Sequence, residues 1–180
     1  MKTLLLAILL LLIFSPPQDL ESKIKTFRNH KRFSVNYDKF KDESWIDVGP
    51  FVVGGDMRYF MTSTQLHMTA RLRYSGTTIK KPVNNFVLWF QATGKDWTFL
   101  KDRDLYALID GERFDLGEGR HDGDVRHYGG VSETLGFLIP AEVFQKMGKA
   151  EKTELKIGRI ELTLKDEHKE AFRDLYSLSK

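Results

Sequence analysis

Apolar and polar side chains alternate through residues 66–74, which read Leu66-His67-Met68-Thr69-Ala70-Arg71-Leu72-Arg73-Tyr74. A period of two is typical of a β-strand that turns one face to a core and the other to water. Residues 86–90 are apolar without alternation, which favours a central strand covered on both faces and places Trp89 in the core. Together the two patterns indicate a fold built on strands.

Turn and helix signals lie on either side of these stretches. Asp110-Gly111 separates two apolar segments and supplies the positive φ angles of a tight hairpin turn. Short helices are expected near 140–147 and near 166–178, where apolar side chains recur at spacings of three and four. Further strands are expected over 33–37, 44–48, 98–100, 133–139 and 153–164, the last with a bulge or turn at Gly158. The sequence therefore predicts a mainly β chain folded as an antiparallel β-sandwich or partly open barrel.

The first residues have the layout of a secretory signal peptide, in which Lys2 precedes an apolar run from Leu4 to Phe14. That run of 11 residues is shorter than the roughly 20 that a membrane-spanning helix needs. We therefore expect a mature chain without a transmembrane helix, exported to the periplasm or the extracellular space. The expected division is a signal peptide over 1–22, a solvated basic lead-in over 23–32 and one β-rich domain over 33–180. The alternative is a membrane-associated accessory protein held by an uncleaved N-terminus and the lead-in.

Composition excludes several kinds of chemistry. The chain of 180 residues has no cysteine, so disulfides, thiolate catalysis, N-terminal lipidation and cysteine-bound zinc are excluded. Its net charge is +3, and charges of both signs are spread along the chain rather than gathered with aromatic residues. A nucleic-acid partner is therefore not expected.

Polar side chains are concentrated in the glycine-rich segment 118–130, which we expect to be a hairpin loop. Imidazole and carboxylate groups can bind a divalent metal ion, or act together as a base and its orienting acid. The segment contains His121, Asp122, Asp124 and His127. Their spacing matches neither the His-Glu-x-x-His motif nor a calcium loop. We therefore assign no metal ligand and no catalytic residue, and take these four as candidate binding residues.

Trp97 is a fifth candidate binding residue, because it follows a turn and an exposed aromatic ring can stack on a sugar or a peptide. No serine lies in a nucleophile motif and no glycine pair opens a phosphate-binding loop, so no cofactor is expected. The function favoured is a non-catalytic binding or structural module of the cell envelope, whose partner would be an envelope protein, a glycan or a peptide. The alternative is a metal-dependent hydrolase that uses the 118–130 loop.

Several short motifs in the middle and C-terminal half of the sequence consist of turn and strand-edge residues. They are Trp97, Asp102-Arg103-Asp104-Leu105, Asp110-Gly111-Glu112-Arg113, Leu116-Gly117, His121-Asp122-Gly123, Gly130-Val131-Ser132-Glu133 and Ile139-Pro140. Read together over residues 35–178, they resemble a loosely defined family of uncharacterised exported bacterial β-domain proteins. The resemblance implies an extracytoplasmic β protein and brings no activity, cofactor or catalytic residue with it.

Overall fold

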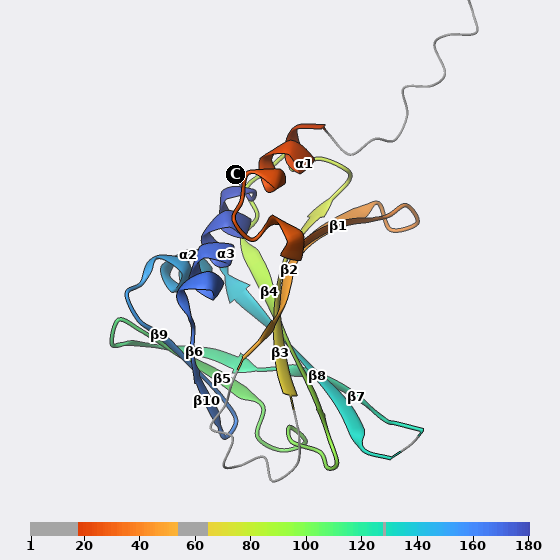
Figure 1. Ribbon diagram of the computed structural model, residues 1–180, viewed down its shortest axis with the longest axis vertical. Coiled ribbons are helices and arrows are strands. Elements are labelled where there is room, and N and C mark those ends of the chain that lie inside the picture. Colours follow the sequence, from red (N-terminus) through yellow and green to blue (C-terminus); the bar gives the residue numbers. More distant parts are fainter. Residues whose placement is uncertain (1–17, 54–64, 128) are drawn as a thin grey trace, which may run out of the picture.

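The computed structural model describes residues 18–53, 65–127 and 129–180, and it contains two antiparallel sheets (Figure 1). The larger sheet has six strands in the order β1-β2-β3-β4-β8-β7. They are β1 (Phe33–Asp38), β2 (Glu43–Val52), β3 (Gln65–Ser75), β4 (Asn85–Gly94), β8 (Val131–Pro140) and β7 (Arg120–Val125). The smaller sheet has four strands in the order β10-β9-β5-β6. They are β10 (Ile160–Thr163), β9 (Thr153–Ile157), β5 (Asp104–Ile109) and β6 (Glu112–Glu118). The prediction of a mainly β sandwich is confirmed, and the two sheets do not close into a barrel.

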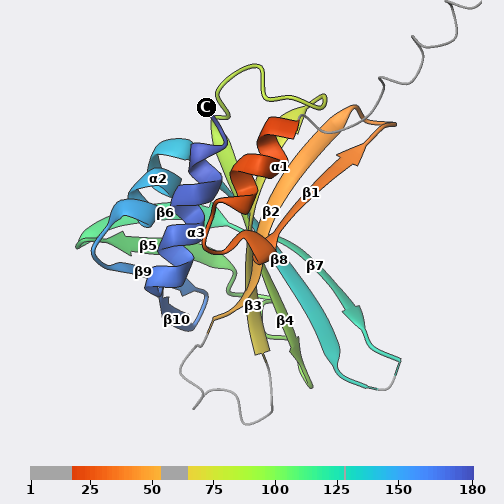
Figure 2. The same ribbon diagram turned by 45° about the horizontal axis from the view of Figure 1, so that its top comes forward.

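Helices cover one face of the six-stranded sheet, which we call its inner face. The helical elements are α1 (Gln18–Lys25), the 3-10 turn η1 (His30–Arg32), α2 (Ala141–Lys149) and α3 (Asp166–Ser177). Figures 1 and 2 show the helices and the four-stranded sheet on the same side of the larger sheet. The ring of Phe86 on β4 stacks 4.1 Å from that of Phe144 on α2, which lies 4.7 Å from Phe172 on α3. This aromatic stack joins both helices to the sheet, and each such pair contributes about 0.5–1.5 kcal/mol beyond the burial of area.

The alternation that predicted β3 is present in the structure. Its apolar side chains are buried on the inner face, and Thr69 and Arg71 lie on the other, outer face. Residues 86–90 of β4 differ from the prediction, because this strand alternates as well. Phe86, Leu88 and Phe90 are fully buried, whereas Trp89 is only half-buried and lies on the outer face. The expected core position of Trp89 is therefore wrong, since none of the described elements covers this side of the sheet.

Both predicted tight turns are confirmed. Asp110 and Gly111 have φ angles of 48° and 86° in the hairpin between β5 and β6. Gly158 has a φ of 53° between β9 and β10, and a Cβ there would collide with the carbonyl oxygen of Asp102. The helices near 140–147 and 166–178 correspond to α2 and α3. Residues 98–100, in contrast, are not a strand.

Most side chains of the basic segment 23–32 are exposed, as expected, but the segment also contacts the core. Ile24 on α1 is 7% exposed and belongs to the core, and the ring of Phe27 packs 5.4 Å from that of Phe33. Lys23 Nζ also donates to the backbone oxygen of Ser177 at the end of α3. Position 22, the expected cleavage point, lies inside α1, and residues 1–17 of the expected signal peptide lie outside the described residues. Within the described ranges, no helix has the length and apolar character needed to cross a membrane.

Candidate functional site

A groove of about 600 Å³ runs over the outer face of the six-stranded sheet. We call it the outer groove. Its lining comes from five neighbouring strands and consists of Asp47, Thr69, Arg71, Trp89, Arg120, Asp122 and Thr134. Neighbouring residues across a sheet turn their side chains to the same face. The register therefore decides which side chains meet here, because it pairs Thr69 with Trp89, and Asp122 with Thr134.

Trp89 lies against the backbone of Gly136, its partner across the β4–β8 ladder. A Cβ added at position 136 would collide with the indole ring, so only glycine leaves room for the ring in this position. The indole Nε1 has no exposed surface and no hydrogen-bond partner among the described residues. An unpaired buried donor of this kind destabilises a protein by about 1–3 kcal/mol. His168 Nε2 and Asp174 Oδ2 on α3 are likewise buried without a hydrogen-bond partner among the described residues, so this feature is not peculiar to the groove.

Arg71 and Asp47 form a fixed pair at one end of the outer groove. The Arg71 guanidinium donates from Nε to Asp47 Oδ1 at 2.7 Å and from Nη2 to Asp47 Oδ2 at 2.9 Å. It also lies 5.2 Å from the centre of the Trp45 ring. A two-pronged arginine–carboxylate pair of this kind holds both side chains in a defined geometry. The charges of this pair therefore already compensate each other.

Arg120 and Asp122 lie at the other end, on the edge strand β7. Both side chains are exposed, and neither makes a hydrogen bond or an ion pair with any residue in the described ranges. Arg120 is opposite Gly136 and Asp122 is opposite Thr134, so both are near the strand that supports Trp89. The groove thus has a cation and an anion whose hydrogen-bonding groups are available to a ligand.

On the inner side of the same strands, Glu133 is the hub of a second polar cluster. Its carboxylate is 1% exposed and accepts hydrogen bonds from the backbone N–H groups of Thr98, at 2.5 Å, and Phe99, at 2.9 Å. His121 Nε2 lies 3.1 Å from Glu133 Oε1. These contacts hold the backbone of Thr98 and Phe99 by a side chain and not by a strand partner, at the place where a strand was expected over 98–100.

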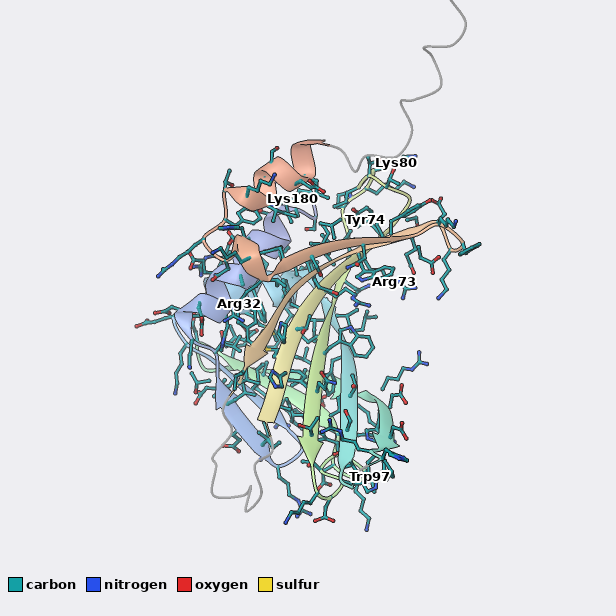
Figure 3. All side chains as sticks on the ribbon, turned by 45° about the vertical axis from the view of Figure 1, so that its right-hand side comes forward. Arg32, Arg73, Tyr74, Lys80, Trp97 and Lys180 are labelled. Atoms are coloured by element: carbon teal, nitrogen blue, oxygen red, sulfur yellow. The ribbon has the colours of Figure 1, made fainter. Side chains whose placement is uncertain are left out.

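The five sequence-predicted binding residues are divided between the two faces. The ring of His121 on the inner side lies 6.0 Å from that of Trp97, which packs so closely on Gly123 that a Cβ there would collide with it. Figure 3 places Trp97 at the lower end of the sheet, away from Arg73 and Tyr74 at its upper end. Asp122 alone of the five lines the outer groove. Asp124 pairs with Ser132 near the end of β7, and His127 is exposed beyond that strand.

The prediction of a loop over 118–130 is wrong, because residues 120–125 form β7 and pair with β8. A strand separates adjacent side chains, so His121 and Asp122 point to opposite faces. Throughout the described ranges, no group of three or more histidine, aspartate or glutamate side chains is arranged to hold a metal ion. The four side chains that the hydrolase hypothesis requires together are therefore not gathered in one site.

Sequence reasoning missed most of the outer groove. Its missed residues are Asp47, Thr69, Arg71, Trp89, Arg120 and Thr134. The alternation in residues 66–74 did place Thr69 and Arg71 on a water-facing side. The identity of their neighbours on other strands depends on the register, for which the sequence carries no local signal.

A second hollow, of about 830 Å³, lies on the outer face of the four-stranded sheet. The charged groups that line it have partners within the molecule. Lys156 Nζ lies 3.2 Å from Glu161, and the Arg113 guanidinium lies 4.9 Å from the centre of the Tyr106 ring. This hollow therefore offers a ligand fewer free hydrogen-bonding groups than the outer groove does.

The fold is that of a two-sheet β protein. One face of its larger sheet has a polar groove that is lined at the bottom by a tryptophan ring. Comparison with family models, with curated proteins and with solved structures found no match to this chain. The resemblance to exported bacterial β-domain proteins stays a prediction.

Proposed function

We propose that this chain is an exported, non-catalytic binding module of the cell envelope, and that its ligand binds in the outer groove. The observation that carries the proposal is the pair of exposed side chains Arg120 and Asp122, which lie in the groove beside the half-buried Trp89 and have no partner among the described residues. A ligand that hydrogen-bonds to both would use two charged groups that the fold itself leaves unused.

The position of the imidazole–carboxylate pair supports a binding role rather than a hydrolytic one. His121 and Glu133 face the inner side of the sheet, whereas the outer groove lies on the opposite side. Glu133 also accepts two backbone hydrogen bonds, so its carboxylate is part of the fold. Export is supported by the apolar run from Leu4 to Phe14 after Lys2.

Nuclear magnetic resonance of the three tryptophan indole groups tests this proposal. The chain has Trp45, Trp89 and Trp97, so an ¹⁵N-labelled sample gives one indole N–H signal for each, and Trp89→Phe identifies the signal of interest. We expect at least one compound from a screen of oligosaccharides and short peptides to move the Trp89 signal and leave that of Trp97 in place.

Two arginine variants provide the matched controls. Arg120→Ala should weaken the response at Trp89, and Arg113→Ala, on the outer face of the smaller sheet, should leave it unchanged. A screen in which no compound moves the Trp89 signal would overturn the proposal. Export has a separate test, in which the full chain is expressed in a bacterium and its fractions are probed; retention in the cytoplasm contradicts it.

A further inference from the structure

The chemistry of the outer groove indicates the class of ligand, and the inference made here rests on the proposed binding function. Trp89 lies along the sheet against Gly136, so its ring forms part of the floor. A flat aromatic floor favours a ligand with a flat apolar surface. Sugar rings have such a surface on the side that carries their C–H groups, and their hydroxyls project around it.

The charges of the groove balance, which favours a neutral ligand. Asp47 and Arg71 are paired with each other, and Arg120 is matched in sign by Asp122. An anionic ligand drawn to Arg120 would also approach two carboxylates, and a cationic ligand would approach two guanidinium groups. Neutral hydroxyl groups both donate and accept hydrogen bonds, so that neighbouring hydroxyls match an arginine donor beside an aspartate acceptor.

Most of the backbone under the groove is not open to a peptide. Strands β3, β4 and β8 each have a hydrogen-bonded neighbour on both sides, so their N–H and C=O groups are used within the sheet. A peptide that binds by strand addition needs a free edge, and among the described strands that line the groove only β7 has one, at the end of the lining. Over the rest of the groove a ligand is recognised by side chains, namely the indole ring and the two threonine hydroxyls, with the charged pair on β7 beside them.

The dimensions favour a chain of sugars over a single one. The lining extends from β2 to β7 across four strand-to-strand steps. At about 4.8 Å for each step, this is roughly 19 Å along the sheet. We propose that the outer groove binds a neutral glycan chain that lies across the strands, with one sugar ring stacked on Trp89 and its hydroxyls held by Arg120 and Asp122.

Titration of the labelled protein with defined oligosaccharides tests this inference. The neutral probes are the hexamers of cellulose, chitin and starch; the contrasting probes are an acidic galacturonic hexamer and an uncharged hexapeptide. We expect a neutral hexamer to move the Trp89 indole signal in a saturable way. Arg120→Ala and Asp122→Asn should each raise its Kd about ten-fold, and Arg113→Ala should not change it.

Two Trp89 variants test the stacking, with binding measured by calorimetry because neither variant has the Trp89 indole signal. Trp89→Phe keeps a smaller ring, so we expect intermediate binding, whereas Trp89→Ala should abolish binding. Tight binding of only the acidic hexamer or the peptide at Trp89 would overturn the glycan inference and leave the proposed binding function standing. If no probe of any class moved the Trp89 signal, both would be overturned.

Discussion

On the inner face of the six-stranded sheet, the buried carboxylate of Glu133 accepts two backbone hydrogen bonds and contacts His121. On the outer face of the same sheet, the buried N–H of Trp89 has no partner among the described residues. Glu133 lies on β8, and Trp89 lies on the adjacent strand β4. The difference is that Glu133 is committed to the fold, whereas Arg120 and Asp122, on the outer face near Trp89, have no partner among the described residues.

Replacement of Glu133 on the inner face should have the largest effect on stability. Glu133→Ala leaves the buried backbone N–H of Phe99 and the part-buried N–H of Thr98 without an acceptor, so we expect a loss of about 3–5 kcal/mol in the free energy of unfolding. Urea denaturation measures it. Glu133→Gln keeps one acceptor oxygen and should lose less. If both variants unfold like the original protein, the inner face is not held by this carboxylate.

A methyl group beneath the Trp89 ring on the outer face should have a smaller effect. Gly136→Ala places a Cβ where the Trp89 ring lies, and overpacking of this kind destabilises by about 1–3 kcal/mol. The ring should also move, which a shift of the Trp89 indole signal would show. Ser132→Ala, on the outer face of the same strand, is the control and should change stability by less than about 0.5 kcal/mol. Equal behaviour of the two variants would contradict the close contact.

Acidification tests the interior through His168 on α3, whose pKa is lowered because burial disfavours its charged form. Its Nδ1 accepts a hydrogen bond from the backbone N–H of Lys165, and protonation would break that bond. The unfolded chain therefore binds the proton more readily, and stability falls as the pH drops below about 6.5, by at most about 1.4 kcal/mol per pH unit. His168→Asn keeps an acceptor for Lys165 and does not titrate. Its urea midpoint should vary less with pH between 5 and 7, and an identical pH profile would refute the role of His168.

The smallest effect on stability is expected at the free end of the outer groove. Arg120→Ala removes an exposed side chain with no described partner, so the free energy of unfolding should change by less than about 0.5 kcal/mol. Arg71→Ala should lose more, about 1 kcal/mol, because Asp47 then loses its partner. Thermal denaturation of the two variants side by side measures this difference. A larger loss for Arg120→Ala would show that this arginine is structural and not available to a ligand.

Local patterns were sufficient for most of the fold. The alternation in residues 66–74 and the Asp110-Gly111 turn act over a few residues, and the structure confirms both. The composition of β7 is typical of a loop, and only pairing with β8 makes it a strand. Trp89 was misplaced because an apolar run does not reveal whether a second layer covers it. The outer groove brings together residues from position 47 to position 134. They become neighbours through the strand register, which no single segment of the sequence encodes.

The contact between α1 and α3 also determines which end of the domain points away from a surface to which either end of the described chain is attached. Lys23 near the first described residues is bonded to Ser177 near the last, and Figure 1 shows the C-terminus beside α1. Trp97 lies at the opposite end of the sheet from Lys180 in Figure 3. A carrier or solid support joined next to Gln18 or at Lys180 would therefore hold the domain by one pole and point the Trp97 end outward.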